Sequence, residues 1–212
     1  MTTISALTNG FETERITARQ FLAEDREGLR PTLLNPDFAS AFGRSFSDEA
    51  FADSAVQNWG GSSFVLTLIE RDQGRTAGFA SVYPAFFVPP GGALGAQLEV
   101  ALDPAFHHQG LASEVMPALF KWAFDELVYP QGQSLFKLVA VCRSSNLASI
   151  NLMLGLVRFG VRDLGEQEEL LLPSDPAFGN AQAVASRVRI FEVSRDEFRQ
   201  SAAADPPDEV VL

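Results

Sequence analysis

Apolar and polar residues alternate in several short segments of the chain, which is the pattern of half-buried β-strands. The segments 63–70 and 75–83 are separated by the turn sequence RDQG and predict a β-hairpin. The next segment, 96–103, places Glu99 on the face opposite Leu98. The predicted strands are 14–21, 63–70, 75–83, 96–103, 136–142, 168–172 and 187–193.

Other segments carry apolar residues at the spacing of amphipathic helices. The clearest stripe, within residues 110–128, consists of Leu111, Val115, Leu119, Trp122 and Leu127. Residues 146–156 predict a second helix, and residues 48–59 predict a third with Ser47 as its N-cap. A short helical segment is also expected at 25–29.

The order of these elements predicts an α/β fold, in the mixed α+β sense, with helices on both faces of a mixed sheet. Strand 96–103, the helix after it and strand 136–142 should form a right-handed crossover with the two strands parallel or nearly so. Residues 1–199 are expected to form one domain, and 200–212 a mobile acidic tail. The Pro/Gly-dense loop 84–95 is either a substrate-side lid or a long hairpin connection.

Composition narrows the function classes. The net charge of −11 and the scattered arginines give no basic footprint for nucleic acid. An acidic surface favours cationic amine substrates, although solubility is the simpler explanation of the charge. The apolar runs are too short for a membrane span, and the N-terminus has no signal-peptide pattern. Cys142 is the only cysteine, so we expect a cytoplasmic protein with no disulfide and no metal.

The stretch FHHQGLASE, residues 106–114, contains both histidines of the chain. Adjacent histidines in a loop point in different directions, and the chain has no third His and no cluster of cysteines to complete a metal site. The residues after them suit an anion better. Gly110 permits close approach to the backbone, and the N–H groups of 111–113 lack partners at the start of a helix. This combination predicts a phosphate cradle, to which His107 and His108 add pH-dependent contacts.

The loop from His107 to Ala112 resembles the diphosphate loop of the GNAT acyltransferases, (Arg/Gln)-x-x-Gly-x-(Gly/Ala), with His at the first position. Its flanks, DPAFHHQGLASEVMPALFKWAF, are similar to the branch of that family that acetylates N-termini of ribosomal proteins. Three further stretches resemble the same branch in the same order: FETERITARQF, the N-x-x-S element at Asn146 and Ser149, and RVRIFEVSRDEF. The resemblance spans about residues 11–199.

This resemblance implies a single GNAT-like domain with a mostly antiparallel sheet of six to seven strands. A splay is implied between the strands near 97–103 and 136–142, with the pantetheine of acetyl-CoA lying in it. Acetyl-CoA is thus the implied acyl-donor cosubstrate. The residues implied to contact it are Val100, Ala101, Leu102, His107, His108, Gln109, Gly110, Leu111, Ala112, Ser113 and Asn146.

Three glutamates and one serine are candidates for the chemistry. Glu99 is the first candidate for the base that deprotonates an amine, because a carboxylate between apolar neighbours is costly unless it is hydrogen-bonded or functional. The alternative is that Glu99 faces solvent or an arginine; Glu168 or Glu169 is the second candidate for the base. The tyrosine that often protonates the leaving thiolate in this family falls on Met153, so Ser149 is implied to assist instead.

These features predict an N-acetyltransferase that transfers an acetyl group directly from acetyl-CoA to a primary amine, on a protein N-terminus or a small molecule. The alternatives are a non-catalytic acyl-CoA sensor with the same fold, or another nucleotide-binding protein using the helix start at 110–113. The second lacks a G-x-G-x-x-G or G-x-x-x-x-G-K-[ST] motif. The expected partners are acyl-CoA and an amine, without nucleic acid or membrane, in a monomer or homodimer.

Overall fold

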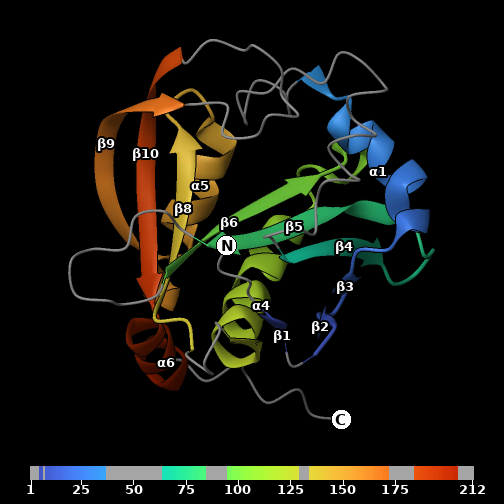
Figure 1. The fold of residues 1–212 in the computed structure, drawn as a ribbon, viewed down its shortest axis with the longest axis horizontal. Coiled ribbons are helices and arrows are strands. Elements are labelled where there is room, and N and C mark those ends of the chain that lie inside the picture. Colours follow the sequence, from blue (N-terminus) through green and yellow to red (C-terminus); the bar gives the residue numbers. More distant parts are fainter. Residues whose placement is uncertain are drawn as a thin grey trace.

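The computed structural model describes residues 5–6, 8–36, 64–84, 95–128, 134–171 and 184–204. The helix predicted at 48–59 and most of the loop 84–95 lie outside these residues. The helices within them are α1 (Arg26–Leu33), α4 (Leu111–Glu126), α5 (Leu147–Gly155) and α6 (Arg195–Ala204). Figure 1 labels them on the ribbon. Among these helices none is long and apolar enough to cross a bilayer.

Within the described residues, eight strands form the main sheet, in the order β2-β3-β4-β5-β6-β8-β10-β9. A second, two-stranded sheet pairs β1 (Ser5–Ala6) with β7 (Leu127–Val128). The main strands are β2 (Gly10–Glu12), β3 (Ile16–Gln20), β4 (Phe64–Glu70), β5 (Thr76–Pro84), β6 (Gly95–Leu102), β8 (Lys137–Arg143), β9 (Arg162–Leu171) and β10 (Val184–Ser194). The mixed, mostly antiparallel sheet is confirmed, but the predicted count of six to seven is too low. The extra strand, β2, is too short to show alternation.

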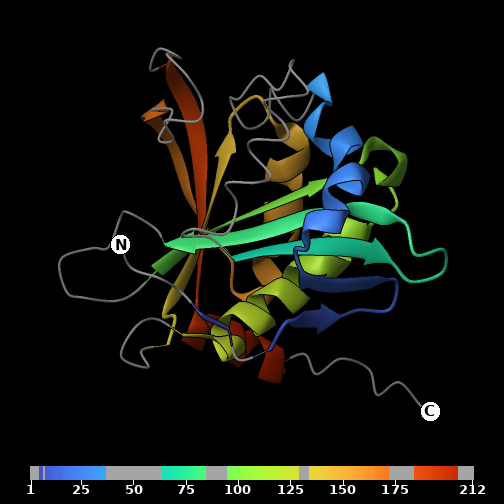
Figure 2. The ribbon, with the colours of Figure 1, turned by 45° about the vertical axis from the view of Figure 1, so that its right-hand side comes forward.

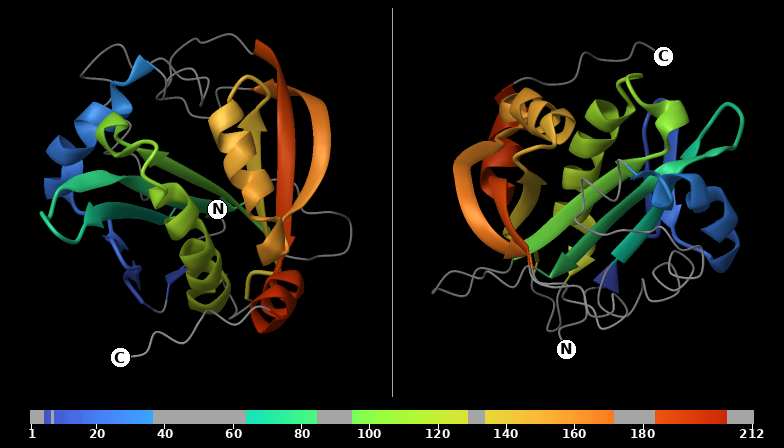
Figure 3. Two further views of the ribbon diagram at one scale, coloured as in Figure 1. Left: turned by 180° about the vertical axis from the view of Figure 1, so that it is seen from behind. Right: turned by 90° about the horizontal axis from the view of Figure 1, so that it is seen from above.

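Helices cover both faces of the sheet, as predicted. Seen from behind, α4 and α5 lie in front of the strands, whereas α1 lies on the far side (Figure 3). The even-numbered apolar residues of β4, including Leu66 and Leu68, join the core around α4. Val65 and Phe79 are buried on the opposite face, where α1 packs against β5. The predicted apolar stripe of 110–128 is buried along its whole length, but the helix ends at Glu126 and Leu127 belongs to β7.

The main sheet parts between β6 and β8, its one parallel neighbour pair in the described residues. These strands pair only at Gly95–Lys137, Ala96–Leu138 and Gln97–Val139. Beyond these pairs they diverge, and in Figure 2 β4 to β6 run across the view while β8, β10 and β9 run up it. The predicted parallel crossover and the splay are therefore confirmed.

The C-terminal segment contains a helix, α6, where the sequence predicted none. At the start of α6, the Ser194 hydroxyl accepts a hydrogen bond from the Glu197 N–H at 3.2 Å. The Glu197 carboxylate in return accepts from the Ser194 N–H at 3.0 Å. This reciprocal capping box stabilises the helix start. The helix runs to Ala204, so the first part of the predicted tail 200–212 is helical.

A buried carboxylate, Asp25, ties α1 to two strands. It is 7% exposed and accepts two hydrogen bonds from Arg19 on β3, at 2.7 and 2.6 Å. Thr67 on β4 and the Leu22 N–H also donate to it, at 2.7 and 2.8 Å. Burial opposes ionisation of Asp25, but these hydrogen bonds outweigh it and hold its pKa below the ordinary value.

Asp25→Asn is therefore expected to lower the free energy of unfolding by about 2 kcal/mol at neutral pH. Because the folded-state pKa is lowered, the stabilisation is complete above the unfolded-state pKa, about 3.9, and is lost as pH falls through the folded-state pKa. Urea unfolding of both proteins at neutral pH and at about pH 3 measures the difference between them. A difference that stays constant over this interval would contradict the assignment.

Candidate active site

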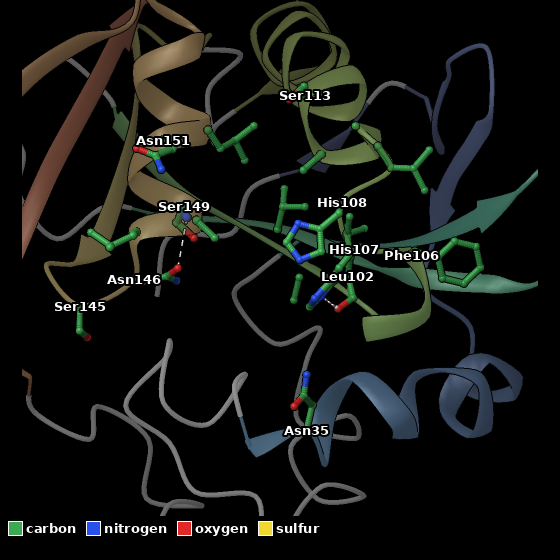
Figure 4. Close-up of a pocket in the computed structure, with 18 residues that line it drawn as sticks. Asn35, Leu102, Phe106, His107, His108, Ser113, Ser145, Asn146, Ser149 and Asn151 are labelled. Carbon is green, nitrogen blue, oxygen red and sulfur yellow. Dashed lines mark hydrogen bonds between the residues drawn. The ribbon is translucent and has the colours of Figure 1, made fainter.

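A cavity of about 910 Å³ opens where β6 and β8 part. Its walls come from the end of β6, the loop before α4, and the first turns of α4 and α5 (Figure 4). Figure 4 shows His107 and His108 on one side and Asn146 and Ser149 on the other. The described residues that line it are Asn35, Val100, Ala101, Leu102, Phe106, His107, His108, Gly110, Leu111, Ala112, Ser113, Ser145, Asn146, Leu147, Ala148, Ser149, Asn151 and Leu152.

The structure brings together all of the cofactor-contact residues implied by the sequence except Gln109. The Gln109 side chain donates to the Ala105 carbonyl at 2.7 Å. The backbone carbonyl of Gln109 accepts a hydrogen bond from Arg15 Nη1 at 2.8 Å. Both hydrogen bonds hold Gln109 on the side of the loop that faces away from the cavity. The motif could not show this, because Arg15 is distant in the sequence.

The first turn of α4 has the features of an anion site. Its N-cap is Gly110, in the left-handed region with φ 77°, and no side chain caps the helix. The N–H groups of 111–113 therefore remain available to a ligand in the cavity, where the helix dipole also favours negative charge. His108 has a positive φ of 58° as well, which makes the loop turn sharply before the helix.

The edge of β6 presents backbone groups to the same cavity. Alternate residues of an antiparallel strand direct their N–H and C=O groups to opposite edges. The Asp103 N–H donates to the Ala77 carbonyl at 2.9 Å. The backbone N–H and C=O groups of the odd-numbered residues of β6 therefore point toward β5. The backbone groups of Val100 and Leu102 consequently point to the other edge, from which β8 has diverged.

The two histidines have different environments. His107 Nε2 lies 3.0 Å from the Leu102 carbonyl oxygen. A carbonyl only accepts hydrogen bonds, so Nε2 carries the proton and links the loop to the end of β6. The His108 ring is perpendicular to that of His107, with centroids 6.2 Å apart. The two rings therefore meet edge to face, and both line the cavity.

The opposite wall of the cavity is the start of α5. Asn146 is the N-cap of this helix, and its Oδ1 accepts from the Ser149 N–H at 3.1 Å. The Asn146 side chain therefore caps the helix, while both residues also line the cavity. Met153, one turn further on, is buried at 4% exposure and is outside the lining.

Glu99 lies on the face of β6 opposite Leu98 and Val100, and it is not among the residues that line the cavity. Tyr83 on β5 donates to its Oε1 at 2.9 Å, and Ser81 donates to its Oε2 at 3.4 Å. Glu99 thus has hydroxyl partners rather than an arginine among the interactions described. The second candidate, Glu168, is exposed on β9, and β10 and β8 separate that strand from β6. The side chain of Glu169 lies outside the described residues.

Sequence reasoning assigned no role to Arg15 or Glu114, although both belong to the quoted motifs. Glu114 Oε1 accepts from Thr13 Oγ1 at 2.5 Å and from the Arg15 N–H at 2.8 Å. Arg15 Nε donates to Glu114 Oε2 at 2.6 Å. Burial opposes ionisation of Glu114, but these hydrogen bonds prevail and lower its pKa. The sequence did contain a signal for this ion pair. Arg15 and Glu114 carry opposite charges and lie in two stretches that resemble the same family.

Cys142 has the properties of a structural residue. It is 7% exposed on β8, and burial raises the pKa of its thiol to about 11. The thiol is therefore protonated at neutral pH and cannot serve as a nucleophile.

The uncapped start of α4 and the open edge of β6 thus border one cavity and direct backbone N–H groups toward it. The sequence model of an acetyltransferase (GNAT) domain matches residues 15–156, more than half of the chain. The chain therefore belongs to the GNAT acetyltransferases, transferases that use acetyl-CoA, and the predicted family is confirmed. No curated protein sequence matches the chain.

Solved structures share the fold. A GNAT-family acetyltransferase from Bacillus anthracis has 18% identity and a TM-score of 0.64, with 88% of this chain and 99% of that chain covered. Spermidine N-acetyltransferase from Vibrio cholerae, solved with CoA and spermine, has 11% identity, a TM-score of 0.65, and 87% and 98% coverage. Ribosomal-protein-S5-alanine acetyltransferase from Vibrio fischeri has 13% identity, a TM-score of 0.62, and 89% and 98% coverage.

Proposed function

We propose that this chain transfers an acetyl group from acetyl-CoA directly to a primary amine. The observation that carries the proposal is that one cavity joins the uncapped start of α4 to the open edge of β6. A diphosphate fits N–H donors at a helix start, and an amide-containing arm fits a strand edge.

The residues present suit acetyl-CoA in size as well as polarity. Gly110 and Ala112 are small, so the backbone N–H groups of the loop are accessible to a diphosphate. The edge groups of Val100 and Leu102 are placed to pair with the pantetheine amides. When bound, acetyl-CoA supplies a thioester whose carbonyl carbon accepts the amine and whose thiolate departs.

The protein's own contribution to the reaction is proton transfer and positioning. An ammonium group has no lone pair, so it must lose a proton before it attacks the carbonyl. We assign this to Glu99, whose carboxylate is held by Tyr83 and Ser81 on the face of the sheet near α1. Ser149 lines the cavity and would donate a hydrogen bond to the departing thiolate.

The test is a thiol-release assay with acetyl-CoA across a panel of amines. The panel contains spermidine, an N-terminal peptide, amino acids and amine antibiotics, because the solved relatives include enzymes named for a polyamine and for a ribosomal protein. The net charge of −11 favours cationic acceptors. Calorimetric titration with CoA is run alongside. Amine-dependent thiol release supports the proposal, and absence of CoA binding overturns it.

A second function, a non-catalytic acyl-CoA sensor, is favoured by one observation. The buried Met153 stands where the family often has its proton-donating tyrosine, and a thioether cannot donate a proton. Tight CoA binding without thiol release on any amine would support the sensor. For either function we propose a cytoplasmic protein, a monomer or homodimer, that binds neither nucleic acid nor membrane. Cell fractionation tests the location, and light scattering tests the oligomeric state.

A further inference from the structure

Arg15 lies against the outer side of the diphosphate loop. Its Nη1 donates to the Gln109 carbonyl at 2.8 Å. A Cβ added to Gly110 would point toward Arg15, 3.7 Å from Nη2. Gly110 lines the cavity, whereas Arg15 and Gln109 do not. The peptide that joins 109 to 110 therefore has Arg15 on one side and the cavity on the other.

The orientation of this peptide decides what the cavity presents to an anion. In a trans peptide the carbonyl and the N–H point in opposite directions, and the described residues contain no cis bond. Because the Gln109 carbonyl points outward to Arg15, the Gly110 N–H points inward. The reverse orientation would turn a carbonyl oxygen toward the phosphates.

Because Gly110 is flexible, the orientation of the Gln109–Gly110 peptide depends on contacts from outside the loop. A glycine adopts positive and negative φ values with similar ease, so the loop itself selects the observed orientation only weakly. The guanidinium of Arg15 donates a charge-assisted hydrogen bond to the Gln109 carbonyl. The carbonyl can accept it only in the observed orientation of the peptide.

Glu114 holds Arg15 in this position. Its Oε2 binds Arg15 Nε at 2.6 Å, and its Oε1 accepts from Thr13 and the Arg15 N–H. A second arginine, Arg71, donates from Nη1 to the Thr13 carbonyl at 2.8 Å, which anchors the same segment. Arg15 also offsets the negative charge of Glu114, which would otherwise repel an anion at the start of α4.

We propose that Arg15 is a positioning residue for the cofactor: held by Glu114, it turns the Gln109–Gly110 peptide so that its N–H faces the diphosphate. This inference rests on the proposed function, because it assumes that CoA occupies the cavity. It assigns to Arg15 no contact with the thioester or the amine.

The experiment compares wild type with Arg15→Met, which keeps an unbranched, flexible side chain but removes the guanidinium and its donors. The dissociation constant for CoA should rise about 10- to 100-fold, the effect of weakening a hydrogen bond to a charged group. The KM for acetyl-CoA should rise in parallel, while kcat at saturation is kept. With S-acetylpantetheine, which lacks the diphosphate, kcat/KM should match wild type.

Two further variants complete the design. Arg15→Lys keeps the positive charge but replaces the two nitrogens that bind Glu114 and Gln109 with one ammonium, so it should restore only part of the affinity. Lys121→Met, on the exposed side of α4, is the matched control and should bind CoA like wild type. Melting temperatures verify that each variant is folded.

The outcomes separate the two proposals. If wild type fails to bind CoA, the proposed function fails first and the role of Arg15 fails with it. If wild type binds CoA and Arg15→Met binds equally well, only the role of Arg15 is overturned. An equal loss of kcat/KM with acetyl-CoA and with S-acetylpantetheine would also overturn it, because the effect would not act through the diphosphate.

Discussion

Glu99→Gln is expected to lower kcat about 10²- to 10⁴-fold, the range for loss of a general base. The substitution keeps the shape of the side chain and an oxygen that can accept from Tyr83. It removes only the ability to take a proton. CoA binding should be retained, because Glu99 lies outside the cavity lining. Thiol release at saturating acetyl-CoA and amine measures the effect.

The pH profile adds a readout specific to proton transfer. Without a base, the variant depends on amine that is already neutral in solution, so its rate should continue to rise toward the pKa of the amine. Glu168→Gln on β9 is the matched comparison and should keep the wild-type rate, since β8 and β10 separate its strand from β6. A large loss in Glu168→Gln with full activity in Glu99→Gln would reverse the assignment of the base.

Ala112→Glu should reduce CoA affinity about 100-fold or more, equivalent to about 2.7 kcal/mol. Ala112 is the second residue of α4 and lines the cavity, so a glutamate there occupies the anion site with its own charge. A carboxylate in the first turn is favourable for the helix itself. The melting temperature should therefore be kept while binding, measured by calorimetry, is lost.

The control for the added charge is Ala203→Glu, an exposed position near the end of α6 and outside the cavity lining. It makes the same chemical change on another helix and should leave CoA affinity unaltered. If Ala112→Glu binds CoA as well as Ala203→Glu does, the start of α4 does not hold the diphosphate.

Much of this architecture was predictable because its signals are local. The stripe from Leu111 to Trp122 and the alternation in 63–70 come from the fixed periods of helices and strands. The start of α4 at Gly110 follows from residues that are adjacent in the chain. The capping box of Ser194 and Glu197 was equally local and could have been predicted from the S-x-x-E spacing.

Other features were not predictable because their partners are distant along the chain. Gln109 has the sequence position of a cofactor contact, but its carbonyl is directed outward by Arg15. The hydroxyl partner of Glu99 is Tyr83 on the neighbouring strand, and this contact depends on the register of β5 against β6. Strand β2 has only three residues, so its existence depends on pairing with β3.

The sequence by itself determined the elements, the family resemblance and the place of the phosphate loop, since periodicity, helix caps and turn residues act between near neighbours. Only the tertiary structure decided which way that loop faces and what surrounds Glu99. Arg15 and Glu114 are far apart in the sequence and meet because β3 and α4 belong to one packed sheet-and-helix core. Their hydrogen bonds stabilise one orientation of a peptide that glycine alone would leave free to turn.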